Sequence, residues 1–273
     1  MSHLAEALHR TRPARFPARP ILTGLAIGLL ALANPSAAGE LHDAVRSGDT
    51  ARTDALLASG ADIEATDFVI GAPLHVAITV GDRALVALLV QRGADVEAAS
   101  ENSASRPLHL AAEAGQADIL AILLEQGANI DALDQPGATA VHRAVVAGKE
   151  DAVRFLLARG ADITIGDGLT GARPLHKAAE TGQTPIALLL LEAGADINAA
   201  DNAGYTALHL AATPVSFSNA GGPELIELLI ERGADPQARD KSGKTPLDYA
   251  QARSGYAQFA EIADHLRRLT GRQ

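Results

Sequence analysis

Nine histidines give this chain of 273 residues its most versatile side chains. An imidazole can bind a transition metal or transfer a proton near neutral pH. Zinc, however, needs each ligand nitrogen at about 2 Å, whereas neighbouring packed helices lie about 8–10 Å apart. Histidines that recur once in each unit of a regular repeat are too far apart to bind one metal ion together. We therefore expect them to have a structural role. The regular ones follow each other at 33 or 34 residues: His42, His75, His109, His142, His176 and His209.

The carboxylates show the same regularity. The two carboxyl groups of a catalytic pair must lie about 5–10 Å apart, in environments that give them different pKa values. Carboxylates at equivalent positions of successive repeats are instead spaced along the stack. No complete Gly-x-x-x-x-Gly-Lys-Ser/Thr phosphate loop occurs, because Gly243-Lys244-Thr245 has Ala238 in place of the first glycine, and the absence of cysteine excludes disulfides and thiolate chemistry. We therefore predict no catalytic residue, no metal and no cofactor. The recurring aspartates are Asp62, Asp95, Asp162, Asp196 and Asp235.

A second series of residues shows that the whole chain is periodic. Glycines that open Gly-Ala-Asp or Gly-Ala-Asn stand at Gly60, Gly93, Gly127, Gly160, Gly194 and Gly233. Two independent markers with one period indicate a repeat architecture. The last interval is longer because six residues are inserted within 214–223.

Each unit carries the signals of two short helices. The first begins at Leu-His-x-Ala, as in 108–111, and a proline often precedes it at the first helical position. A glycine six residues after the histidine, such as Gly115, ends this helix. Paired apolar residues such as Leu123 and Leu124 mark the second helix. Helices this short are marginal alone, so each pair must pack on the next, which predicts an all-α repeat solenoid.

The unit that starts at Asp201 resembles the ankyrin repeat. It contains Thr-Ala-Leu-His-Leu-Ala at 206–211 and Arg-Gly-Ala-Asp at 232–235, close to the T-P-L-H-x-A signature of that family. The resemblance extends over residues 40–270. It implies about seven repeats including caps, joined by short β-hairpin fingers, with a concave face of fingers and first helices that binds proteins. It also implies that the motif histidine ties the turn to the helix start.

Departures from the motif mark particular units. The predicted domain covers residues 39–273, with units starting near residues 40, 67, 100, 134, 167, 201 and 240. The motif threonine is replaced by Ala72, Arg106 and Arg173 in three units, so we expect those helices to lack a hydroxyl cap. Asp248 replaces the motif histidine before a charged helix that reaches Arg268, which predicts a C-terminal cap.

Residues 1–38 have the order of a secretory signal peptide. Four arginines precede the apolar run 21–33, and small residues follow at Ser36 and Ala38. Thirteen apolar residues span about 20 Å as a helix, less than a bilayer core of about 30 Å. We expect cleavage after Ala38 and a periplasmic or secreted protein. The alternative is an uncleaved inner-membrane anchor.

Charge limits the class of partner. Residues 39–273 hold 19 lysines and arginines against 32 aspartates and glutamates. An acidic body repels nucleic acid and anionic lipid. We expect a monomer that binds another protein, with no nucleic acid and, after signal cleavage, no membrane.

The positions that packing leaves free are the candidates for partner contact. Phe68, Val69 and Ile70 are apolar at a finger tip where other units are polar, and Phe217 stands on the inserted loop. Exposed apolar groups favour an interface, although Phe68–Ile70 could instead cover the N-terminal cap. The remaining candidates are the finger residue Tyr205 and residues on the first helices: Arg46, Thr79, Glu113, Val146 and Glu180.

These features predict a non-enzymatic, exported protein-interaction module that scaffolds or assists a resident protein. An inhibitor or immunity-type protein that blocks a toxic enzyme is the alternative. An enzyme built on the solenoid is a more remote one.

Overall fold

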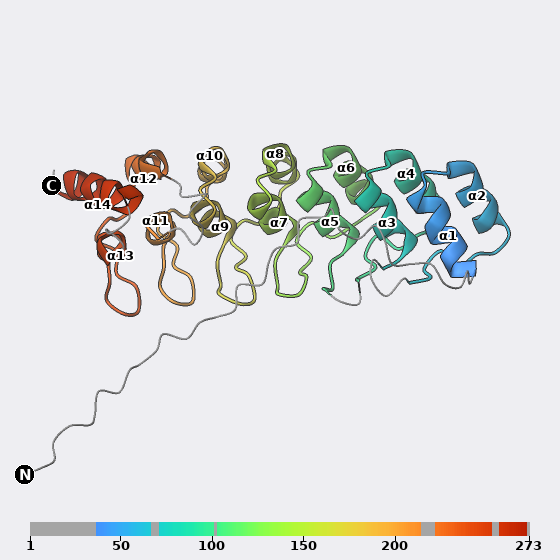
Figure 1. Cartoon of the computed structure of the whole chain (residues 1–273), viewed down its shortest axis with the longest axis horizontal. Coiled ribbons are helices and arrows are strands. Elements are labelled where there is room, and N and C mark those ends of the chain that lie inside the picture. Colours follow the sequence, from blue (N-terminus) through green and yellow to red (C-terminus); the bar gives the residue numbers. More distant parts are fainter. Residues whose placement is uncertain (1–36, 67–70, 101–102, 214–221, 253–256, 272–273) are drawn as a thin grey trace, which may run out of the picture. The chain divides into compact units, whose positions relative to one another are not determined.

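The computed structural model describes residues 37–66, 71–100, 103–213, 222–252 and 257–271, which form fourteen helices. Figure 1 shows these helices in two rows, with the loops between successive pairs projecting from the first row. The first row contains α1 (Ala37–Arg46), α3 (Pro73–Val80), α5 (Pro107–Ala114), α7 (Ala140–Val146), α9 (Pro174–Glu180), α11 (Ala207–Ala211) and α13 (Pro246–Ala252). The second row contains α2 (Thr50–Ala58), α4 (Arg83–Gln91), α6 (Ala117–Glu125), α8 (Glu150–Ala158), α10 (Thr184–Glu192), α12 (Gly222–Glu231) and α14 (Ala257–Thr270).

Each helix contacts its partner in the pair and the equivalent helix of the next pair, so the packing is between neighbours only. This arrangement confirms the predicted all-α repeat solenoid. Glycines end the helices as expected, because Gly81 and Gly127 have φ of 81° and 91°, a left-handed conformation that disfavours side chains. Among the described residues, no helix has both the length and the apolar character needed to cross a membrane.

The core lies between the two rows and is built from leucine and alanine. Motif leucines such as Leu108 and Leu175 are buried, and so is the first leucine of the second-row pairs from α4 to α12, such as Leu123. Small alanines at the helix contacts allow close approach, which explains a core with few aromatic rings. At the C-terminal end, α14 packs on α12 and α13 and buries Phe259 and Leu266. A helix longer than the others thus closes the stack, as expected for a cap.

The motif histidines join each unit to the next one. In the units of His109, His142, His176 and His209, Nδ1 accepts the N–H of the residue three positions earlier, at 3.0–3.2 Å. Nε2 of His142 donates to the carbonyl of Ala172 in the following unit at 3.0 Å, and His42 donates to Gly71 at 2.9 Å. An imidazole that accepts at Nδ1 and donates at Nε2 is neutral. Each of these buried rings therefore has a fixed tautomer and bridges two units.

The motif threonine bonds to the side chain three positions later, and at Thr245 its hydroxyl also caps the helix by accepting the N–H of Asp248 at 3.3 Å. The hydroxyls of Thr139 and Thr206 lie 2.9 and 3.0 Å from Nδ1 of the histidines in their own units. They thus stabilise the imidazole at the start of the helix. Where arginine replaces threonine, the imidazole still accepts the backbone N–H. Thr245 alone pairs with a carboxylate, because Asp248 accepts both its N–H and its hydroxyl at 2.8 Å.

The fingers are hydrogen-bonded turns that form their own row. The N–H of Asp134 donates to Ala138 within one finger at 3.0 Å, and the N–H of Gly168 donates to Pro136 of the preceding finger at 2.9 Å. Equivalent bonds join Asn202 to Thr170. No extended strand forms within the described residues, because each hairpin is only a few residues long.

The recurring aspartates also have a structural role. Oδ1 of Asp95 accepts the N–H two residues later, a turn that aspartate favours. The N–H of the same residue donates to Glu64 of the preceding unit at 2.8 Å. The same pattern recurs at Asn129, which bonds to Glu97 at 2.7 Å. These bonds couple consecutive units at their second turns.

Acidification should destabilise the protein through the histidine bridges. Burial lowers the pKa of His75, His109, His142, His176 and His209. The unfolded chain, with an ordinary histidine pKa near 6.5, therefore takes up protons before the folded chain does. Stability is then complete above about pH 6.5 and declines as the pH falls below that value toward the lowered pKa values of the folded histidines. Denaturant titrations across this range test the expectation, and a flat profile would contradict it.

His142→Ala serves as the internal comparison for this prediction. It should lose about 1–3 kcal/mol at neutral pH, because buried partners remain unpaired, and its stability should depend less on pH. A chelator should leave both melting temperatures unchanged.

Ala104→Gly should stabilise the protein. Ala104 has φ of 46°, whereas the equivalent finger positions carry glycine, as at Gly137 with φ of 89°. Glycine relieves the strain of the left-handed conformation but loses more entropy on folding. The net increase in the free energy of unfolding should be about 0.5–1 kcal/mol. The reciprocal variant Gly137→Ala should be clearly destabilising, because a Cβ there would lie 2.6 Å from the backbone nitrogen of Gly168. Denaturation midpoints at an unchanged m-value measure both, and an unstable Ala104→Gly protein would refute the strain argument.

Candidate protein-binding face

The fingers and the first-row helices together form the finger–helix face. Two helix positions contribute to it: the residue after the motif histidine, which is buried in the unit of Val76, and the residue four positions after the histidine. Glu113 on α5 pairs with Arg143 on α7 at 3.9 Å, so these two positions of neighbouring units meet. Arg143 also donates from Nε to Asp134 of its own finger at 2.7 Å. The ion pairs on this face therefore run along the stack and from the helices to the fingers.

In the next unit, Lys177 lies between two carboxylates. Its Nζ is 3.1 Å from Asp167 and 3.3 Å from Glu180. Burial opposes the charge of Lys177, but the two carboxylates outweigh it and raise the pKa of the ammonium. Burial likewise opposes ionisation of Asp167, yet hydrogen bonds from Thr170 and Lys177 outweigh it and lower the pKa of the carboxyl to about 2. Both groups are thus charged at neutral pH.

The helix candidates from the sequence occupy equivalent places on this face but differ in their contacts. Arg46 pairs with Asp43 at 3.0 Å, and Thr79 donates to the carbonyl of His75 at 2.8 Å. Val146 stands at the position of Glu113 and Glu180, and 47% of its side chain is exposed. It is the apolar member of an otherwise polar series.

Tyr205 belongs to an aromatic cluster at the C-terminal end of the face. Its ring meets that of Tyr249 edge-on, with centroids 5.5 Å apart, and their hydroxyls are 3.1 Å apart. Tyr249 also donates to Asp240 of its finger at 2.5 Å. Tyr205 is half-buried, so one part of the ring remains available to a partner. The candidates Phe68, Val69, Ile70 and Phe217 lie outside the described residues.

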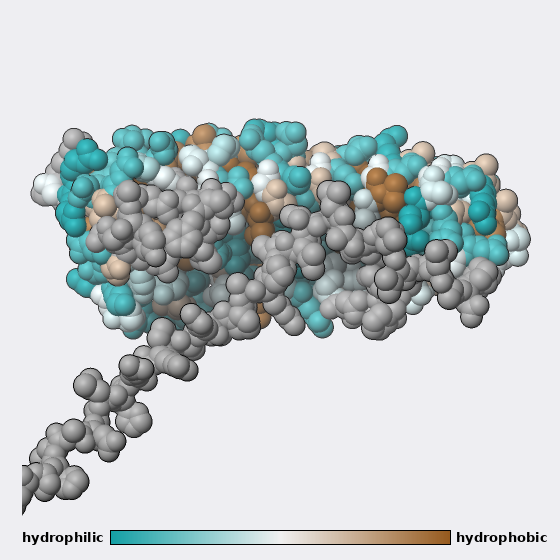
Figure 2. All heavy atoms as spheres, in the orientation of Figure 1, coloured by the Kyte–Doolittle hydropathy of each residue, from teal (hydrophilic) through white to brown (hydrophobic). Residues whose placement is uncertain are grey.

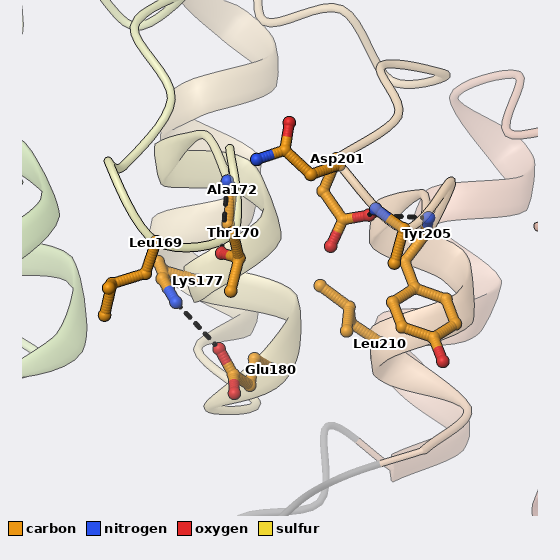
Figure 3. Close-up of a pocket in the computed structure, with 10 residues that line it drawn as sticks. Leu169, Thr170, Ala172, Lys177, Glu180, Asp201, Tyr205 and Leu210 are labelled. Carbon is orange, nitrogen blue, oxygen red and sulfur yellow. Dashed lines mark hydrogen bonds and ion pairs between the residues drawn. The ribbon is translucent and has the colours of Figure 1, made fainter. Parts of the chain in front are cut away.

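A hollow of about 450 Å³ opens between the finger 167–172 and the finger 201–205. Figure 3 shows Leu169 and Lys177 on one side of it, with Tyr205 and Leu210 on the other. Glu180 and Asp201 contribute carboxylates to its lining. Leu169 is 72% exposed at the tip of its finger. The hollow therefore combines apolar walls, one aromatic ring and charged groups.

The carboxylate of Asp201 in this hollow is bonded through only one of its oxygens to the described residues. The finger aspartates bind their own turns through Oδ1, as Asp201 does with the N–H groups of Ala203 and Tyr205 at 2.8 Å. In the other described fingers that carry aspartate, Oδ2 meets the residue that follows the histidine position: Arg143, Lys177 or Tyr249. The unit of Asp201 has Leu210 there, so Oδ2 of Asp201 accepts no hydrogen bond from the described part of the chain.

The sequence pointed to Glu180 and Tyr205, which the structure places together in the hollow, but missed Leu169, Lys177, Asp201 and Leu210. Leu169 was detectable, because an apolar residue at a finger tip is the criterion that selected Val69. Asp201 and Leu210 were not, since their significance depends on where the finger side chains point.

Apolar surface on the visible side of the molecule is scattered among hydrophilic residues, as Figure 2 shows. The large apolar side chains that the described residues expose are Val80, Leu133, Val146 and Leu169. Within the same described ranges, no three histidine, aspartate or glutamate groups converge as metal ligands. The finger–helix face can therefore contact a partner through its shape, its charged groups and isolated apolar side chains.

Comparisons with known proteins agree with this architecture. The family model for ankyrin repeats, described as three copies, matches residues 41–134, 74–167, 141–240 and 175–266. Among solved structures, the chain is similar to the ankyrin repeat domain of Bcl-3, described as a unique member of the IkappaB protein family. The two are 28% identical with a TM-score of 0.67, over 84% of this chain and 97% of that one. No curated protein sequence matches the chain. The family model covers most of the sequence, and the chain therefore belongs to the ankyrin-repeat family.

Proposed function

We propose that this protein is an exported binding module that holds a resident protein through its finger–helix face, without catalysing a reaction. Ankyrin repeats support a role in protein–protein interaction. The observation that carries the assignment of the face is the hollow beside the exposed Leu169, with the exposed Val146 on the preceding unit. The second-row helices have no comparable exposed large apolar residue among those described.

The groups on this face suit binding better than chemistry. Lys177 is held protonated between two carboxylates and is no nucleophile. Burial and the hydrogen bond to Asp240 raise the pKa of Tyr249, which keeps its hydroxyl protonated. Exposed apolar side chains, in contrast, lose water when a partner covers them, and this is the main source of affinity at protein interfaces.

Replacing both exposed apolar residues should weaken the partner. Leu169→Ser with Val146→Ser should cost about 2 kcal/mol of affinity or more, as hot-spot losses do, with little change in melting temperature because both side chains are exposed. Affinity capture from a periplasmic extract, followed by titration of the captured protein, measures this. Glu192→Ser, on the second-row helix α10 of the Leu169 unit, is the matched control and should bind normally. If the unmodified protein, the double variant and Glu192→Ser all bind the partner equally, the partner does not bind to this face.

The activity of the captured protein separates the two roles that the sequence left open. A helper leaves its partner active. An inhibitor of a toxic enzyme abolishes activity and holds its target at about nanomolar affinity or tighter.

Export should leave a chain that begins at Gly39. Basic residues, an apolar run and small residues ending at Ala38 support this proposal. Helix α1 begins at Ala37, so cleavage removes two residues of its first turn and retains the buried Leu41 and His42. Intact-mass measurement on the periplasmic fraction tests the prediction. Recovery of only the uncleaved chain from the cytosol would refute export, and an uncleaved chain in the membrane fraction would indicate the anchor.

A further inference from the structure

The repeat supplies an internal standard for the hollow at Asp201. Three finger aspartates are satisfied on both oxygens, and two of them pair with a cation: Asp134 with Arg143, and Asp167 with Lys177. In the unit of Asp201 the equivalent residue is Leu210. This unit therefore keeps the acceptor that its neighbours use but lacks the group that would fill it.

Among the described residues that line the hollow, none balances the charge of Asp201. Lys177 is the cation that lines it, but its ammonium is already bonded to Asp167 and Glu180. Two carboxylates on one ammonium leave that cluster without positive charge to offer. An anionic ligand would meet Asp201 and Glu180, so charge complementarity favours a cation.

The walls suit a basic side chain better than a small inorganic cation. Leu169, Leu210 and the ring of Tyr205 provide apolar surface around the carboxylate. Lysine and arginine bury their methylene stems against such surface while the charged end reaches an acceptor. The volume of about 450 Å³ exceeds that of one side chain and leaves room for the backbone that carries it.

We propose that this hollow receives a lysine or arginine side chain of the partner protein, with Oδ2 of Asp201 as its acceptor. The partner thereby supplies in trans the cation that Arg143 and Lys177 supply in cis to their own fingers. The proposal rests on the protein-binding function and adds a basic anchor residue to it.

Small probes test the hollow without the partner. The ¹⁵N-labelled protein is titrated with N-acetyl-arginine methylamide, N-acetyl-lysine methylamide and the neutral isostere N-acetyl-citrulline methylamide. One or both basic probes should cause saturable shifts at the amides of Ala203 and Tyr205, which bond to Asp201. The citrulline probe should bind about tenfold more weakly, because its N–H donors are uncharged and lose the charge-assisted part of the hydrogen bond to the carboxylate. The two basic arms identify which head group is preferred.

Two variants localise the effect. Asp201→Asn keeps the Oδ1 acceptor for the turn and removes the charge, so the basic probes should bind about tenfold more weakly at an unchanged melting temperature. Leu210→Lys places a cation where Lys177 stands in the preceding unit, and it should abolish probe binding by occupying Oδ2 from within. Glu227→Gln on α12 removes the same charge from the second row and should bind the probes as the unmodified protein does.

Equal binding of the arginine, lysine and citrulline probes, or unchanged binding by Asp201→Asn, would overturn the proposal. Asp201→Asn decides the matter if Leu210→Lys fails to fold. Binding of the captured partner to these variants distinguishes this inference from the proposed protein-binding function. If the partner is lost by Leu169→Ser with Val146→Ser but retained by Asp201→Asn and Leu210→Lys, protein binding holds and the basic anchor is wrong. If no partner is captured although the probes discriminate, the proposed function fails and the cation site remains.

Discussion

The structure depends on one interaction, the buried imidazole that in α5, α7, α9 and α11 joins the start of a first-row helix to the next unit. A helix of seven or eight residues is not stable alone, and its first N–H groups lack partners within the helix. His142 satisfies one such N–H, at Thr139, and donates to Ala172 of the following unit. The same ring therefore completes a helix and fixes its distance from the neighbour. Because burial keeps the ring neutral, one nitrogen accepts while the other donates, which a protonated ring could not do.

This constraint explains how the rest of each unit is used. The imidazole, the core leucines and the turn glycines define each unit. The finger turns, and the turns at recurring residues such as Asp95, add further hydrogen bonds between neighbouring units. All of these contacts connect consecutive units, so stability is approximately a sum of local terms. Positions that take no part in them are free to vary. On the first-row helices, one position outside the core and the turns carries Glu113, Val146 or Glu180 in successive units.

The hollow at Asp201 arises from a change at the position after the motif histidine. Where Arg143 or Lys177 follows the motif histidine, the finger aspartate is closed by an internal ion pair. Leu210 leaves the aspartate open and adds an apolar wall, while Leu169 of the neighbouring finger remains exposed. A single departure from the pattern thus converts a structural carboxylate into a group able to face a partner. The fold is preserved because Oδ1 of Asp201 still holds the finger turn.

The sequence by itself determined the period, the helix pairs, the solenoid class and the structural nature of the histidines. Those features follow from residue types at fixed spacing, and a local signal recurring in many units is read reliably. Only the tertiary structure showed that the motif threonine serves the imidazole, and that the finger aspartate points at the residue after the histidine. Asp201 and Leu210 look ordinary in the sequence, since aspartate recurs in fingers and Leu110 occupies the same helix position. They stand out only because the contact between the finger aspartate and the residue after the histidine is made in other units and missing in this one. A sequence pattern does not show in which direction a side chain points, so it could not reveal this difference.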